Sequence, residues 1–127
     1  MSRRFSVSAR FRSVRFAVRG IITMLQTQHN AWLHAVATGL VGAAAFRLKL
    51  PASDWLWLIP AIVSVWTAEA LNTAFEFLAD AASPDFHPLV EKAKDVAAGA
   101  VLITACGAIA VGILVFGPHL TEVFAGP

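Results

Sequence analysis

"WLWLIPAIVSVWTAEALNTAFEFLA", residues 55–79, is the stretch that decides the fold. A helix needs about 20 mostly apolar residues to cross a bilayer, and this stretch supplies them while carrying two glutamates and one asparagine. Residues 31–50 and 96–116 are two further apolar stretches of suitable length. The chain has 127 residues, of which 57% are hydrophobic and only 14% are charged, a composition unlike that of ordinary soluble domains. We therefore predict one all-α domain over residues 1–127 with three membrane-spanning helices.

The N-terminal segment, residues 3–27, interleaves arginine with Phe, Val and Ile. Six of the ten Lys and Arg residues of the chain precede the first apolar stretch, namely Arg3, Arg4, Arg10, Arg12, Arg15 and Arg19. This pattern favours an amphipathic helix on the membrane surface, with arginines at the lipid phosphates. Basic residues that flank membrane spans tend to stay in the cytoplasm. We expect a multi-pass protein of the cell inner membrane, with its N-terminus inside and its C-terminus outside.

Two other interpretations of the basic segment are disfavoured. A cleaved signal peptide needs an uninterrupted apolar core and a small-residue cleavage site, whereas arginines recur here through Arg19. A nucleic-acid-binding role needs a larger basic surface than the few scattered cations of the remaining chain provide. The single cysteine, Cys106, cannot form an internal disulfide and is interpreted as apolar filler.

Polar residues recur along one face of the helix predicted at 55–79. Glu69, Asn72, Glu76 and Asp80 are spaced by three and four residues, so they share one side of an α-helix. A charged side chain near the centre of a bilayer costs about 2.5–3.5 kcal/mol, and this stripe must therefore face protein, water or a ligand. Carboxylates close to lysines at a membrane surface suggest Mg²⁺ held between acids and a phosphate.

Two non-enzymatic interpretations of the stripe stay open from the residues alone. The acids could line a pathway for ions or protons through the membrane. They could also join helices in a small assembly protein.

The motif "EALNTAFEFLAD" (69–80) is followed by "DFHPLVEKAKDVAAGAVL" (85–102). Together they closely resemble the prokaryotic diacylglycerol kinase family of small integral-membrane lipid kinases, which includes undecaprenol kinases. The resemblance covers almost the whole chain. It implies a homotrimer with shared active sites near the cytoplasmic surface, where ATP and Mg²⁺ are used to phosphorylate the hydroxyl of a membrane lipid in phospholipid or envelope metabolism.

The resemblance also implies roles for individual residues. Glu69 would be the general base for the lipid hydroxyl, Asn72 would position that hydroxyl, and Glu76 would bind the metal ion. Asp80 would support the loop that follows, and Asn30 and His34 match supporting positions of the family. The ATP-binding residues would be Phe16, Glu76, Asp85, Phe86, His87, Lys94 and Asp95.

One position departs from the family pattern. The segment "QHNAWLH", residues 28–34, has Gln28 where the family has a glutamate that joins the metal site. An amide oxygen is a possible Mg²⁺ ligand but carries no charge, so we expect weaker metal affinity, an altered metal preference or loss of activity. The residues of the motifs resemble the undecaprenol kinase branch more closely. The sequence does not show whether the lipid substrate is undecaprenol or diacylglycerol.

Overall fold

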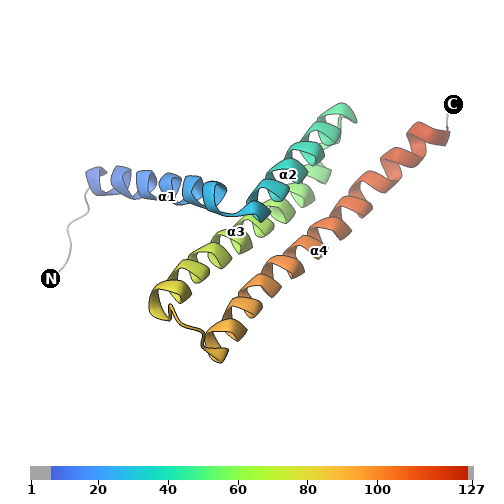
Figure 1. Ribbon diagram of the computed structural model, residues 1–127. Helices are drawn as coiled ribbons and strands as arrows, with labels where there is room; N and C mark the ends of the chain where they lie inside the picture. Colours follow the sequence, from blue (N-terminus) through green and yellow to red (C-terminus); the bar gives the residue numbers. More distant parts are fainter. Residues whose placement is uncertain (1–6, 126–127) are drawn as a thin grey trace.

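The computed structural model describes residues 7–125, and this part of the chain consists of four α-helices without strands. They are α1 (Val7–Thr27), α2 (His29–Arg47), α3 (Ala52–Ala82) and α4 (Pro88–Ala125). In Figure 1, α2, α3 and α4 run side by side, and α1 turns away from them at the start of α2. The prediction of an all-α fold is confirmed.

The turn between α2 and α3 is set by one residue in a left-handed conformation. Lys49 has a φ angle of 52°, and its N–H donates to the carbonyl oxygen of Phe46 at 3.1 Å. The N–H of Leu50 donates to the carbonyl oxygen of Ala45 at 3.0 Å. These two bonds form a Schellman motif, which satisfies carbonyl groups at the end of a helix. Pro51 then directs the chain back into α3 as its N-cap residue.

The connection between α3 and α4 is short and spans residues 83–87. Helix α4 already begins at Pro88, a position where the missing N–H of proline is not needed. The Nδ1 atom of His87 accepts a hydrogen bond from the N–H of Leu89 at 3.2 Å, which caps the helix. At its other end α4 continues through Pro118 to Ala125, beyond the apolar stretch predicted at 96–116.

Two helices are long and apolar enough to cross a membrane, α3 and the part of α4 from Pro88 to Thr121. The segment predicted at 31–50 forms α2, which does not meet the same criterion because histidines, asparagine and glycines dilute its apolar residues. Helix α1 follows the predicted surface helix from residue 7 onward, while residues 3–6 lie outside the described residues. Three crossings and a surface-bound α1 therefore stay predictions.

The buried apolar cluster lies at the end of the bundle where α2 turns into α3. It is formed by Ala45, Leu50, Leu58 and Val115. The buried polar residues Glu69, Asn72 and Thr73 lie further along α3, toward α4. Many large apolar side chains on all four helices are exposed. The surface of this chain is thus as apolar as that of a protein surrounded by lipid or by other copies of itself.

Candidate active site

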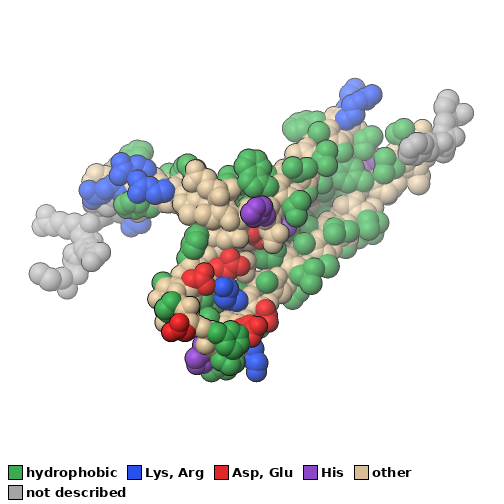
Figure 2. Space-filling view, viewed as in Figure 1, with side chains coloured by type: hydrophobic (Ala, Val, Ile, Leu, Met, Phe, Trp, Pro, Cys, Tyr) green, Lys and Arg blue, Asp and Glu red, His purple; other side chains and the backbone are tan. Residues whose placement is uncertain are grey.

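The polar stripe on α3 passes from a buried to an exposed environment along the helix. Glu69 is only 1% exposed and Asn72 is buried, whereas Glu76 is half-buried and Asp80 is exposed. Figure 2 shows the acidic side chains gathered near the end of the bundle where α3 leads into α4, with a basic side chain among them. The sequence predicted that these four residues share one face, and in the structure the exposure of that face to solvent increases from Glu69 to Asp80.

Glu76 is held by amide groups from two helix segments. Gln28, at the junction of α1 and α2, donates from Nε2 to Oε2 of Glu76 at 3.0 Å. Asn72, one turn earlier on α3, donates from Nδ2 to Oε1 of Glu76 at 3.2 Å. Both carboxylate oxygens therefore accept a hydrogen bond, and the residue expected to hold the metal ion is joined to the position that departs from the family pattern.

Glu69 faces His34 on α2. The Nε2 atom of His34 lies 3.6 Å from Oε2 of Glu69, beyond the usual range of a hydrogen bond. Within residues 7–125, neither oxygen of Glu69 nor Nε2 of His34 has a hydrogen-bond partner, although all three atoms are buried. Leaving such a group unsatisfied costs about 1–3 kcal/mol, and unsatisfied groups often indicate a functional site. The facing pair thus leaves buried polar atoms available for a hydroxyl group that approaches them.

Trp66 and Thr38 hold His34 in place, and sequence reasoning assigned neither to the site. The indole Nε1 of Trp66 donates to Oγ1 of Thr38 at 3.0 Å. The ring of Trp66 meets the imidazole ring edge to face, with centroids 6.5 Å apart. The sequence feature that could have identified them is a polar group within an otherwise apolar segment. A buried indole N–H or hydroxyl needs a hydrogen-bond partner, so such residues are expected to pair.

A polar cavity of about 320 Å³ lies where α3, the connecting loop and α4 meet. It brings together most of the residues expected to border ATP: Asp85, Phe86, His87, Lys94 and Asp95. Phe16 does not line this cavity but a separate groove between α1 and α3. Glu76 lies outside the cavity as well, one turn before Asp80 on α3.

Asp80 connects the two helices that border this cavity. Its Oδ1 atom accepts a hydrogen bond from Nζ of Lys94 at 2.9 Å. The loop itself is held by Ser83, whose hydroxyl donates to the carbonyl oxygen of Asp85 at 3.0 Å. Asp80 thus contacts Lys94, one of the residues expected to bind ATP, and its supporting role for the loop stays a prediction. Asn30 is exposed on the first turn of α2.

The oxygen atoms near Glu76 fit a hard cation that is shared with phosphates. Mg²⁺ is usually bound through one or two carboxylates and the phosphate groups of a substrate. Glu76 supplies one carboxylate, and the neighbouring Asn72 has a buried Oδ1 atom without a partner in the described chain. No group of three or more His, Cys, Asp or Glu side chains that could hold a metal occurs among residues 7–125. The site therefore suits an ion that brings further ligands with it.

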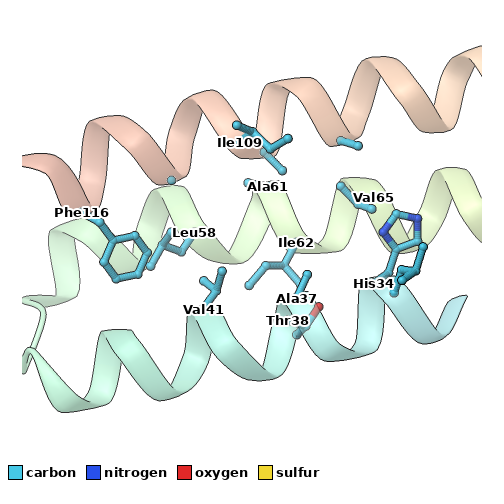
Figure 3. A pocket seen from close by; sticks show the side chains of 14 residues that line it. His34, Ala37, Thr38, Val41, Leu58, Ala61, Ile62, Val65, Ile109 and Phe116 are labelled. Atoms are coloured by element: carbon cyan, nitrogen blue, oxygen red, sulfur yellow. The ribbon is translucent and has the colours of Figure 1, made fainter. Parts of the chain in front are cut away.

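An apolar groove of about 340 Å³ runs between α2 and α4 over α3. Figure 3 shows His34 at one end of this groove, and Leu58 and Phe116 toward the other. The remaining lining is almost entirely aliphatic, apart from Thr38. The groove thus places an apolar surface beside His34, the residue that faces Glu69, an arrangement suited to an amphiphile with a polar end.

Comparisons with known proteins identify the family of this chain. A family model described as prokaryotic diacylglycerol kinase matches residues 15–116. The chain is 36% identical over 110 residues to undecaprenol kinase of Bacillus subtilis (strain 168), covering 87% of this chain and 89% of that protein. It is 37% identical over 109 residues to diacylglycerol kinase of Synechocystis sp. (strain ATCC 27184 / PCC 6803 / Kazusa), covering 85% of this chain and 62% of that protein. These matches support a lipid kinase located in a membrane, and this chain belongs to the prokaryotic diacylglycerol kinase family.

Proposed function

We propose that this protein transfers the γ-phosphoryl group of ATP to the hydroxyl group of a membrane lipid. The observation that carries the proposal is Glu69, a buried carboxylate that has no hydrogen-bond partner in the described chain and faces His34 at the end of an apolar groove. Such a carboxylate is well placed to accept a proton from an alcohol whose apolar tail stays in the membrane. Membership of the family supports the same conclusion.

In this proposal the lipid hydroxyl approaches Glu69 beside His34. Glu69 accepts the hydroxyl proton while the lipid oxygen forms a bond to the γ-phosphorus of ATP. The bond from that phosphorus to the oxygen bridging the β- and γ-phosphates breaks, and ADP leaves with the electron pair. Most of the catalysis in phosphoryl transfer comes from positioning and charge neutralisation. His34, fixed against Trp66, positions the hydroxyl.

The polar cavity between α3 and α4 is proposed to hold the nucleotide. Lys94 would exchange its contact with Asp80 for a phosphate oxygen, because the pair is partly exposed and such pairs are weak. Asp85 and His87 border the cavity from the loop. Glu76 would hold Mg²⁺ together with the ATP phosphates, and the ion would supply neutralisation of the charge that develops on them.

The membrane arrangement is part of the proposal. We infer that α2, α3 and α4 cross the inner membrane and that α1, with its arginines, lies on the cytoplasmic surface. The exposed apolar faces and the open space beside Gly39, Gly42 and Gly107 suit close packing against other copies, so we propose a homotrimer with sites shared between subunits. The protein would serve phospholipid or cell-envelope lipid metabolism.

Undecaprenol is the acceptor that we propose first. The Bacillus subtilis relative named undecaprenol kinase is covered over 89% of its length, whereas the Synechocystis relative is covered over 62%. The groove that reaches His34 is also consistent with an acceptor that has one apolar chain. Diacylglycerol is the alternative acceptor within the same reaction.

The test is transfer of labelled γ-phosphate by the purified full chain in lipid vesicles that contain undecaprenol or diacylglycerol. We expect a labelled lipid product from the wild type and none from Glu69→Gln, which keeps the shape of the side chain but cannot accept the proton. Glu122→Gln, the same change at the far end of α4, is the control and should keep activity. Absence of transfer to both lipids at all magnesium and manganese concentrations would refute the kinase proposal and favour an ion pathway or an assembly role.

A further inference from the structure

Each carboxylate oxygen of Glu76 accepts a hydrogen bond from a side-chain amide. Gln28 and Asn72 each donate an amide N–H to a different oxygen of its carboxylate, at 3.0 and 3.2 Å. Gln28 is itself fixed, because it has an extended backbone at the break between α1 and α2 and its own N–H donates to the carbonyl oxygen of Met24 at 2.9 Å. The two amides thus hold Glu76 from α3 and from the α1–α2 junction.

This arrangement reduces the need of the carboxylate for a positive ion. An anion that accepts two N–H groups is already partly neutralised, and a cation must compete with those donors for the same oxygens. A carboxylate has about four acceptor positions, of which two are used here. The cation would also find only one carboxylate directly at this position, since Gln28 is neutral and no group of three metal-binding side chains occurs among residues 7–125. The protein alone therefore offers a poor cation site.

We propose that Gln28 makes cation binding in this chain depend on the nucleotide, so that the ion enters with the ATP phosphates and does not bind the free protein. The inference rests on the proposed use of ATP. Gln28 acts as a positioning residue, because it holds Glu76 in place until the phosphates arrive. The phosphate oxygens then supply the negative charge that the protein lacks, and the buried Oδ1 of Asn72 is a neutral oxygen next to Glu76. A second carboxylate at position 28 would remove this dependence.

The experiment measures binding of Mn²⁺ to the full chain in lipid nanodiscs, by the electron paramagnetic resonance signal of the free ion. The titration is made with and without β,γ-methylene-ATP, and the binding of Mn²⁺ to the nucleotide alone is subtracted. We expect wild-type protein to show saturable binding only with the nucleotide. Gln28→Glu should bind Mn²⁺ without the nucleotide at least about tenfold more tightly than the wild type, since added ligand charge raises affinity.

Gln26→Glu is the matched control, because Gln26 is exposed and the same change adds the same charge two residues earlier. It should behave as the wild type does. The inference is overturned if wild-type protein binds Mn²⁺ equally tightly with and without the nucleotide, or if Gln28→Glu gains no more than Gln26→Glu. The kinase assay is separate from this readout. Nucleotide-dependent Mn²⁺ binding without phosphoryl transfer would refute the proposed function while leaving this inference in place.

Discussion

Replacing Glu69 with methionine should make the protein more stable and inactive. The side chain is 1% exposed, and neither of its oxygens has a hydrogen-bond partner in the described chain. Methionine is of similar length, is flexible and has no group that requires a partner. Natural sites that trade stability for activity show this pattern, because the function needs a group that the fold alone does not favour.

The size of the effect follows from the desolvation of one carboxyl group. An unsatisfied buried polar group costs about 1–3 kcal/mol, so the free energy of unfolding should rise by about that amount in Glu69→Met. The opposite sign is expected if Glu69 and His34 form a stabilising ion pair, since breaking a buried pair costs about 3–5 kcal/mol. At 3.6 Å the two groups are within ion-pair distance but too far apart for a hydrogen bond, and a buried pair offsets its desolvation only with good hydrogen-bond geometry, so the first outcome is expected. The sign of the change therefore separates a catalytic group from one that joins helices.

The measurement is unfolding by sodium dodecyl sulfate in mixed micelles, followed by tryptophan fluorescence, with kinase activity assayed on the same samples. Thr73→Val is the control, because this buried hydroxyl does have a partner, the carbonyl oxygen of Glu69 at 2.9 Å. The free energy of unfolding of this variant should fall by at most about 1.5 kcal/mol, as expected for the loss of one hydrogen bond, and should not rise. A loss of stability in Glu69→Met as large as that of a broken ion pair would refute the reasoning.

Three further predictions concern other parts of the molecule. Asp80→Asn should change the free energy of unfolding by no more than about 1 kcal/mol, because its pair with Lys94 is partly exposed, and should alter the KM for ATP more than the KM for lipid. Trp66→Phe removes the N–H that binds Thr38 and should lower kcat several-fold, with a loss of stability of about 0.5–1.5 kcal/mol in the same unfolding assay. His119→Gln disrupts the 2.7 Å contact between α4 and the first turn of α3 and should lower stability while leaving both KM values unchanged. A large loss of stability in Asp80→Asn, or a changed KM in His119→Gln, would contradict the view that these contacts serve the site and the fold separately.

Periodicity and composition predicted those features that depend on a single helix. The face shared by Glu69 and Glu76 follows from helix geometry alone, and it is present in α3. The end of α4 was not predictable in this way, because Pro118 is compatible with both a stop and a continuing helix. The turn between α2 and α3 depends on a lysine at a φ of 52°, a conformation that non-glycine residues seldom adopt.

The contacts that define the site depend on packing between helices and could not be read from spacing. Gln28 and Glu76 are 48 residues apart in sequence, and only the packing of the α1–α2 junction against α3 brings them to 3.0 Å. The pairing of Asp80 with Lys94 likewise requires the short loop between α3 and α4. Family resemblance assigned these residues to one site, but it did not indicate which of them form hydrogen bonds with each other.

The distribution of buried groups suggests how the chain tolerates an unsatisfied site. The apolar cluster around Leu58 and Val115 lies at one end of the bundle, beside the hydrogen-bonded turn at Lys49. The unpartnered atoms of Glu69 on α3 and His34 on α2 lie away from that turn, near the end of the apolar groove that His34 lines. Burial of apolar area stabilises a fold in rough proportion to the area removed from water, so the cluster offsets the cost of the site from a distance. A change at the cluster should therefore affect stability without altering the geometry at Glu69, whereas a change at Glu69 should affect both.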